Sequence, residues 1–179
     1  MTVARIRQEY PDCAITLSLG EKSHEAYERF FRAGANRYLL RHETYNELHY
    51  RQLHPAEMFW KHRMDCLWDL KEIGYQVGCG FMVGSPEQTV DTLYEDLQFI
   101  RKLQPHMVGI GPFIPPEGYP RLAKKKAGTM EDTLRLLSII RLLQPHVLLP
   151  STTALGTIHP LGREKDSGRA NVVMPNLSR

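Results

Sequence analysis

The chain has 179 residues, enough for one domain with its own core, and its 42% hydrophobic and 24% charged residues are ordinary for a globular protein. A net charge of +3 is too small to indicate nucleic acid as a partner, and no apolar run approaches the roughly 18 residues of a membrane span. Cys13, Cys66 and Cys79 lie far apart, which argues against a disulfide framework and a cysteine-only metal site. We therefore expect one reduced, cytoplasmic domain over residues 1–179, with no metal ligand assigned.

Short β-rich segments alternate with helical segments along the chain. The expected strands lie at 14–20, 37–43, 75–84, 106–115, 146–153 and 170–176. Apolar residues at helical spacing predict helices over 23–34, 57–73, 89–103 and 129–144. Thr89 and Thr129 are the expected N-caps of the last two helices, and Gly34 and Gly74 the expected ends of the first two.

A short internal sequence repeat indicates how these segments are joined. The stretches 103–112 and 143–152 each end a helix with Gln-Pro-His and open an apolar strand, 40 residues apart. Helices that alternate with apolar strands predict a parallel sheet covered by helices. Such a sheet is either open and doubly wound or a large part of an eight-stranded barrel.

Two observations favour the barrel. No G-x-G-x-x-G fingerprint of a dinucleotide fold follows the first strand. Polar residues also cluster where nearly every strand ends, at Ser18 and Glu21, 41–44, Ser85 and Glu87, 151–153, and Asn176. In a barrel these ends meet at one mouth, where active sites lie; the alternative is a structural network of salt bridges. The expected fold class is α/β, an incomplete (β/α)8 TIM-type barrel of about six βα units with parallel strands.

Six stretches carry a resemblance that runs nearly end to end, at 15–21, 32–44, 70–89, 106–115, 150–158 and 168–176. Together they resemble the radical S-adenosylmethionine enzymes of the biotin-synthase-like group, and within it the HydE-type maturases of [FeFe]-hydrogenase. The resemblance implies S-adenosylmethionine and a [4Fe–4S] cluster as cofactors, and 5′-deoxyadenosyl radical chemistry.

The cluster-binding pattern of these enzymes is absent from the sequence. They hold the cluster with a C-x-x-x-C-x-x-C motif after the first barrel strand, and the 179 residues contain no such motif. The resemblance therefore predicts the C-terminal part of a radical S-adenosylmethionine barrel, truncated at both ends. We expect this chain alone to be inactive in radical chemistry.

The resemblance also implies which residues contact S-adenosylmethionine. It places Ser18, Glu43 and Arg63 on this ligand, where Arg63 would pair with the carboxylate and Glu43 would accept hydrogen bonds from the amine or ribose. The stretch GFMVGSPE, residues 80–87, fits a G-x-I-x-G-x-x-E pattern beside the adenine, with Met82 in the Ile place. This adds Gly80, Met82 and Gly84 to the cofactor-binding residues. Without the resemblance, Arg63 reads as a solvated helix residue.

Four further residues are implied on the substrate, namely Arg41, Thr152, Thr153 and Met174. Arg41 would hold an anionic group, and the two threonine hydroxyls a carboxylate or cyanide. From the residue types alone, both threonines are equally typical of ordinary strand positions. The resemblance assigns no catalytic residue.

The expected function is maturation of the hydrogenase H-cluster, by radical chemistry on a small cysteine–iron complex. Other hydrogenase maturation proteins are expected as further partners, without nucleic acid or a membrane. Three alternatives stay open: a methylornithine synthase- or biotin synthase-like enzyme, an iron-free aldolase- or lyase-type barrel, and an inactive S-adenosylmethionine-binding half-barrel. The aldolase alternative predicts a lysine at a strand end, and none of the six expected strand ends has one.

Overall fold

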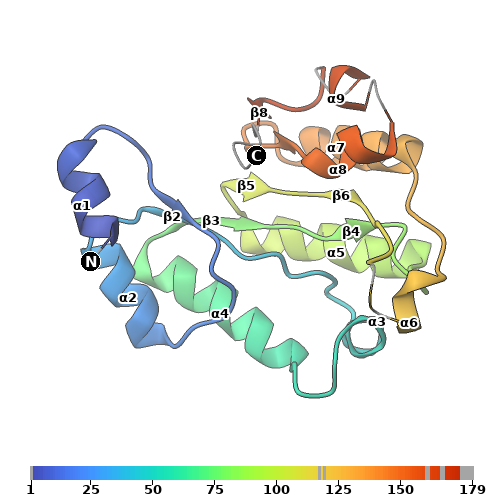
Figure 1. Cartoon of the computed structure of the whole chain (residues 1–179), viewed down its shortest axis with the longest axis horizontal. Helices are drawn as coiled ribbons and strands as arrows, with labels where there is room; N and C mark the ends of the chain where they lie inside the picture. Colours follow the sequence, from blue (N-terminus) through green and yellow to red (C-terminus); the bar gives the residue numbers. More distant parts are fainter. Residues whose placement is uncertain (1, 117, 119, 160–161, 166–167, 174–179) are drawn as a thin grey trace.

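Strands and helices alternate along the computed structural model, which describes residues 2–116, 118, 120–159, 162–165 and 168–173 (Figure 1). The strands are β1 (Thr16–Leu17), β2 (Arg37–Leu39), β3 (Gln76–Cys79), β4 (Met82–Val83), β5 (Met107–Val108), β6 (Gly111–Pro112), β7 (Pro150–Ser151) and β8 (Val172–Val173). The helices are α1 (Thr2–Glu9), α2 (His24–Arg32), α3 (Glu47–Leu53), α4 (Trp60–Ile73), α5 (Val90–Leu103), α6 (Pro120–Ala123), α7 (Met130–Leu143), α8 (Thr153–Ile158) and α9 (Gly162–Lys165). None of the described helices has both the length and the apolar character needed to cross a bilayer.

The described strands pair in parallel and follow one another in chain order. β1, β2, β3 and β5 form one sheet, while β4 pairs with β6 and β7 pairs with β8. Isolated bridges from Glu43 to Phe81 and from Met107 to Leu148 connect these sheets. Parallel neighbours in chain order are the arrangement of a (β/α)8 barrel, so the strands form part of such a barrel, as expected.

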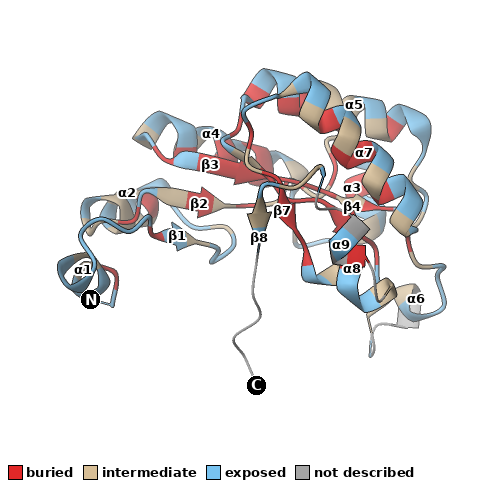
Figure 2. Cartoon of the chain, turned by 90° about the horizontal axis from the view of Figure 1, so that it is seen from above, coloured by how far each residue is buried: buried red, intermediate tan, exposed pale blue. Residues whose placement is uncertain are grey.

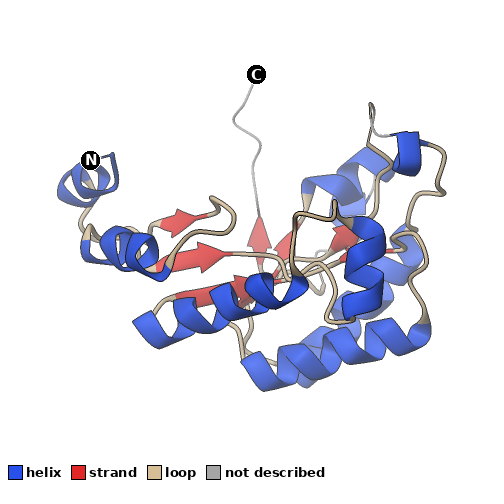
Figure 3. Ribbon diagram, turned by 90° about the horizontal axis from the view of Figure 1, so that it is seen from below, coloured by secondary structure: helices blue, strands red, loops and turns tan. Residues whose placement is uncertain are grey.

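Helices α4, α5 and α7 run along one side of the strands (Figures 2 and 3). Side chains alternate between the two sides along each strand, and Tyr38, Val77 and Val108 lie on the helix-covered side, where they are almost completely buried. The helices contribute the core residues Leu67, Leu70, Ile100, Leu103, Leu137 and Ile140. A doubly wound sheet carries helices on both sides, so the one-sided cover favours the barrel.

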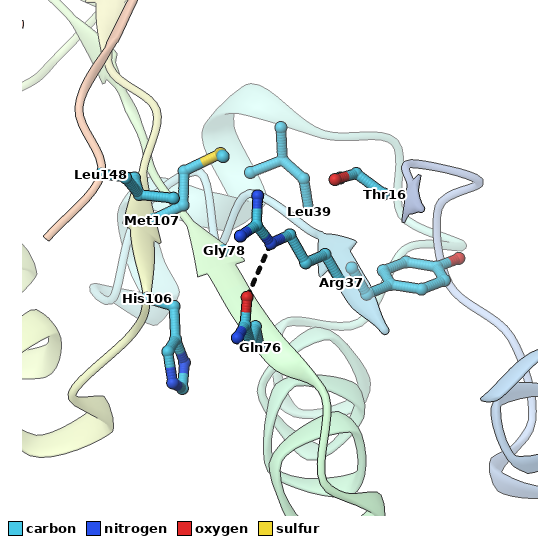
Figure 4. Close-up of a pocket in the computed structure, with 9 residues that line it drawn as sticks. Thr16, Arg37, Leu39, Gln76, Gly78, His106, Met107 and Leu148 are labelled. Carbon is cyan, nitrogen blue, oxygen red and sulfur yellow. Dashed lines mark hydrogen bonds between the residues drawn. The ribbon is translucent and has the colours of Figure 1, made fainter. Parts of the chain in front are cut away.

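The opposite side of the strands corresponds to the inside of the barrel. The strand register places Thr16, Arg37 and Gln76 side by side, and Leu39 beside Gly78. A small cavity lies among these residues, where Arg37 Nε donates a hydrogen bond of 2.6 Å to Gln76 Oε1 (Figure 4). It belongs to the N-terminal part of the strands, away from the mouth where the sequence predicts the site.

Local signals set the helix ends where the sequence places them. Thr89 accepts a hydrogen bond from the Thr92 backbone N–H and forms a reciprocal capping box at the start of α5. Thr129 caps α7 in the same way through the N–H of Asp132. Gly74 ends α4 with a φ of 102°, a conformation that favours glycine.

One hydrogen-bond arrangement occurs twice at the N-terminal ends of the strands. In the Arg7 clasp, the guanidinium of Arg7 donates to the carbonyl oxygens of Pro11, Cys13 and Gly34. In the Arg141 clasp, Arg141 donates to the carbonyl oxygens of Pro145, Val147 and Arg169. Both clasps include an asparagine whose Oδ1 accepts from the N–H directly before a strand, Asn36 from Ile15 before β1 and Asn171 from Leu149 before β7.

The spacing of the clasps corresponds to half of a barrel. The first clasp joins the starts of β1 and β2, and the second joins the starts of β7 and β8. Counting β3 with β4 and β5 with β6 as continuous barrel positions, β7 stands four positions after β1. A complete barrel has eight positions, so the clasps mark equivalent places in its two halves.

Candidate functional site

Arg63 of α4 joins the C-terminal ends of β1 and β2. Its Nε lies 2.6 Å from Oε1 of Glu21, which follows β1. Its Nη1 donates a hydrogen bond of 3.3 Å to the carbonyl oxygen of Arg41, which follows β2. Arg63 is only 9% exposed, so it is a buried ion-pair residue and not the solvated residue that its local sequence suggests.

Glu43 lies in a strained turn at the end of β2. Its φ is 67°, which residues other than glycine rarely adopt, and Thr44 N–H donates to His42 O at 2.8 Å around it. These features describe a γ-turn centred on Glu43. The Glu43 N–H donates to Gly80 O at 3.0 Å, while Oε2 of Glu43 is buried and has no hydrogen-bond partner among the described residues.

Tyr50 of α3 and His54, directly after α3, join this group, although the sequence analysis assigned them no role. Helix α3 lies beside the end of β4 (Figures 1 and 2). The rings of Tyr50 and His54 are 4.2 Å apart between centroids. Tyr50 is fully buried, and its hydroxyl lies next to the guanidinium of Arg63. We call Glu21, Glu43, Tyr50, His54 and Arg63 the mouth cluster.

Burial and charge set the protonation of the mouth cluster. Burial raises the pKa of Tyr50, although the positive charge of Arg63 opposes part of this rise. Burial, helped by Arg63, lowers the pKa of His54 to about 4, so this imidazole is neutral at pH 7. Burial would lower the pKa of Arg63, but Tyr50, Glu21 and Glu43 raise it overall. The cluster therefore contains a permanent cation between two carboxylate-bearing strand ends.

Arg41 differs from Arg63 because its guanidinium is unused. Within the described residues it forms no side-chain hydrogen bond or ion pair, and it is half-buried. Among the described residues, the mouth thus offers a free cation in Arg41 and a free acceptor in Glu43. This set is complementary to a small molecule that carries both an amine and a carboxylate.

A second group of free hydroxyls lies at the end of β7. Ser151 and Thr152 are 6% and 5% exposed, and neither hydroxyl has a hydrogen-bond partner among the described residues. Thr152 Oγ1 lies against β6, since a Cβ built on Gly111 would stand 2.7 Å from it. Thr153 is exposed and is the first residue of α8, not the strand residue that the sequence predicts.

Two other predicted site residues are less informative. Ser18 is exposed, and its hydroxyl donates to the Leu39 carbonyl oxygen at 3.1 Å, which places it between β1 and β2. Met174 lies outside the described residues.

Backbone packing accounts for the glycines of the stretch 80–87. A Cβ on Gly80 would lie 1.9 Å from the Gly109 carbonyl oxygen, and a Cβ on Gly84 would lie 2.6 Å from backbone. The Gln88 side chain braces the stretch, because it donates to Met82 O at 2.8 Å and accepts from Gly84 N–H at 2.7 Å. Close contact between neighbouring segments therefore requires these glycines, in addition to any role beside an adenine.

His49 of α3 is a structural residue of the mouth. Its Nε2 lies 2.9 Å from Pro86 O, and its Nδ1 lies 3.1 Å from Thr44 Oγ1. A carbonyl oxygen only accepts, so Nε2 carries the proton and Nδ1 accepts from the threonine hydroxyl. His49 thereby fastens the segment after β2 to the segment after β4. Its sequence position gives no signal for this role.

The cysteines do not fit an iron–sulfur cluster. Cys13 is exposed, whereas Cys66 and Cys79 are buried. Burial raises the pKa of both buried thiols, the opposite of what a thiolate ligand requires. Among the described residues, no group of three or more His, Cys, Asp or Glu side chains is arranged to hold a metal ion.

Sequence comparisons identify related proteins, although no family model matches the chain. The [FeFe] hydrogenase maturase subunit HydE of Thermotoga maritima is 51% identical over 164 residues, which are 91% of this chain and 47% of that protein. The 3-methylornithine synthase of Methanosarcina acetivorans is 31% identical over 140 residues, 78% of this chain and 39% of that protein. The chain therefore spans less than half the length of these two relatives.

A comparison with solved structures supports the fold. The crystal structure of methylornithine synthase (PylB) superposes with a TM-score of 0.84 and 24% sequence identity. The match covers 99% of this chain and 52% of the other. The described strands and helices are thus a partial barrel of the same architecture.

Proposed function

We propose that this chain, a relative of the radical S-adenosylmethionine enzymes of the biotin-synthase-like group, binds S-adenosylmethionine at the mouth cluster and forms the substrate side of a HydE-type hydrogenase maturase. The 51% identity to a HydE maturase over nearly the whole chain supports this reaction class. The observation that carries the binding site is the buried Glu43 Oε2, without a partner in the described residues and held in a strained turn. Strain and unpaired buried polar atoms are typical of functional sites.

The charges of the mouth cluster fit S-adenosylmethionine. Glu43 accepts hydrogen bonds from the amine or ribose, and Arg63, oriented by Glu21, sets a positive charge beside the carboxylate. Ser18 adds a hydroxyl at the same strand ends. The adenine lies beside the stretch that contains Gly80, Met82 and Gly84. In this group of enzymes, S-adenosylmethionine supplies a 5′-deoxyadenosyl radical.

The role proposed for this chain is to bind and orient the ligand. The cysteines of the described residues do not fit a [4Fe–4S] cluster, so the proposed role of these residues does not include electron transfer. Neutral His54 and buried Tyr50 restrict water around the cluster, which strengthens the interactions of the charged residues. Both residues therefore support ligand binding without adding a charge to the mouth cluster.

The substrate is proposed to bind between the two groups of free polar atoms. Arg41 holds an anionic group, and the buried hydroxyl of Thr152 donates a hydrogen bond to a carboxylate or cyanide. Thr153, exposed at the start of α8, is the other residue of this subsite within the described part of the chain. The chemistry is suited to a small cysteine–iron complex, with other hydrogenase maturation proteins as the partners that supply or receive it.

Titration calorimetry with S-adenosylhomocysteine tests the cofactor site on this chain. The unchanged chain is expected to bind, and Glu43→Gln is expected to bind about tenfold more weakly because a charge-assisted hydrogen bond is lost. Glu47→Gln is a matched control: Glu47 also follows β2, four residues after Glu43, but it is exposed and paired with Arg51. Absence of binding, or an equal loss in both variants, would contradict the proposal.

A methylornithine synthase is the second candidate, favoured by the 31% identity to the Methanosarcina acetivorans enzyme. The name of that enzyme describes an amino-acid product, whose carboxylate would bind Arg41 equally well. Chemical-shift changes in the chain saturated with S-adenosylhomocysteine distinguish the two. Shifts around Arg41 and Thr152 with cysteine, and not with 3-methylornithine, support the maturase. The reverse result supports the synthase.

A further inference from the structure

Asp96 of α5 lies beside the strained Glu43 turn and is completely buried. Its Oδ1 accepts a hydrogen bond of 2.6 Å from the Tyr45 N–H and lies 3.3 Å from Nε2 of His42, which is also completely buried. Its Oδ2 has no hydrogen-bond partner among the described residues. A carboxylate in such surroundings is costly to bury, so its contacts must accomplish something that a neutral side chain would not.

The contacts of Asp96 fall on both sides of Glu43. His42 precedes the centre of the γ-turn and Tyr45 follows it, so one carboxylate joins the two arms of the turn. His42 Nδ1 accepts a hydrogen bond of 3.3 Å from the Gly80 N–H, which leaves the ring proton on Nε2, facing Asp96. His42 Nε2 and Asp96 Oδ1 are in contact without hydrogen-bond geometry, so the bond from the Tyr45 N–H is the directional restraint that Asp96 supplies.

The strain at Glu43 explains why such a joint is needed. A positive φ at a residue with a Cβ persists only where the surroundings over-determine the conformation. Thr44 N–H to His42 O closes the turn, and His49 holds the Thr44 side chain from the other direction. Asp96 supplies the remaining restraint, because its Oδ1 accepts the Tyr45 N–H from 51 residues further along the chain.

We propose that Asp96 is a positioning residue that holds the strained turn and thereby directs the Glu43 carboxylate at the ligand of the mouth cluster. The ligand part of this inference rests on the proposed function, whereas the turn part does not. If Asp96 were purely structural, it would instead hold α5 against the sheet. Its replacement would then speed amide exchange throughout the core to the same extent.

Amide hydrogen exchange on the free chain tests the turn. Asp96→Asn keeps the size of the side chain and removes its charge, and Asp91→Asn, at an exposed position on the same helix, is the control. In Asp96→Asn, the amides of Glu43, Thr44 and Tyr45 are expected to exchange about tenfold faster, with core amides unchanged. Unchanged exchange at the turn, or equal acceleration throughout the core, would overturn the inference.

A glycine at position 43 provides a rescue if Asp96→Asn does not fold. Glycine adopts a positive φ without strain, so Glu43→Gly removes the need for the restraint. The double variant Glu43→Gly/Asp96→Asn is expected to fold and to unfold at the same temperature as Glu43→Gly alone. A double variant that is as unstable as Asp96→Asn would show that Asp96 acts on the core and not on the turn.

A double-mutant cycle tests whether Asp96 acts through Glu43. Asp96→Asn is expected to weaken S-adenosylhomocysteine binding about tenfold, and the double variant with Glu43→Gln to bind no more weakly than Glu43→Gln alone. Losses that simply add would overturn the positioning role. If the unchanged chain binds no S-adenosylhomocysteine, the proposed function fails, and the exchange experiment still decides whether Asp96 holds the turn.

Discussion

At the N-terminal ends of the strands, the Arg7 and Arg141 clasps repeat the same donors and acceptors, whereas the C-terminal ends of the same strands differ. After β1 and β2 the chain forms a buried ion pair and a strained turn, and after β7 it leaves buried hydroxyls without partners in the described residues. N-terminal ends of barrel strands serve stability, and C-terminal ends serve function. The comparison shows that the same hydrogen-bond arrangement at the N-terminal ends of the strands can support two different groups of residues at the C-terminal ends.

The largest expected effect concerns Gly80, where β3 reaches the mouth. Gly80→Ala brings a Cβ to 1.9 Å from Gly109 O and is expected to cost at least about 3 kcal/mol of unfolding free energy. Gly109→Ala is the matched control, because its Cβ would meet nothing nearer than 3.9 Å and should cost less than about 1 kcal/mol. Urea unfolding measures both, and equal costs would show that close packing does not set this segment.

The two clasps are expected to contribute equally. Arg7→Ala and Arg141→Ala each remove charged hydrogen bonds to three backbone carbonyls, and each should lower the unfolding free energy by about 2 kcal/mol. Lysine should not restore it, because one ammonium group lacks the planar fork. Affinity for S-adenosylhomocysteine should stay unchanged. A weaker affinity would mean that the two ends of the strands are not independent.

A pH effect distinguishes the mouth from the clasps. The folded-state pKa of His54 is lowered to about 4, below the ordinary value of 6.5, so the unfolded chain binds more protons between these values. Stability from this group is nearly complete above pH 6.5 and is lost as the pH falls toward 4, by about 2 kcal/mol at pH 5. The difference in unfolding free energy between the chain and His54→Gln, measured at pH 7 and pH 5, should show this loss. No change in that difference would contradict the burial of His54.

The smallest effect on stability should be at Thr152. Unlike the substitutions above, this one is not expected to lower the unfolding free energy. Thr152→Val replaces a buried hydroxyl without a partner among the described residues, so stability should be unchanged or increase by up to about 1 kcal/mol. Substrate-induced chemical shifts at the mouth should weaken at the same time. Thr157→Val is the control, since the Thr157 hydroxyl is exposed and donates only to Thr153 O. A clear loss of stability in Thr152→Val would place this hydroxyl in the structural frame.

Local signals in the sequence predict much of the fold. The four expected helices are all present, and Thr89, Thr129 and Gly74 act as the predicted ends. These features depend on neighbouring residues, which is why periodicity and capping rules find them. Helix α3 was not predicted, because its seven residues are too short for a clear apolar stripe and its N-cap, Asn46, is a common loop residue.

The candidate site was predicted only in part. In the structure, Arg41, Glu43 and Thr152 follow the ends of β2 and β7, and Arg63 of α4 contacts Glu21 after β1 and Arg41 after β2. The assignment of each to a ligand stays a prediction. The pairing of Arg63 with Glu21 was not foreseen, because it joins residues 42 positions apart on separate elements.

The sequence by itself determined the alternation of parallel strands and helices, the helix ends and the family, since each is written in local patterns or in long matching stretches. Only the tertiary structure decided that Asp96 reaches both arms of the Glu43 turn, that Tyr50 and His54 join the mouth cluster, and that the same clasp closes both halves. These are contacts between segments that meet only when the strands are in register. A buried polar atom without a hydrogen-bond partner is likewise a property of the folded chain. In the unfolded chain, water binds every polar side chain.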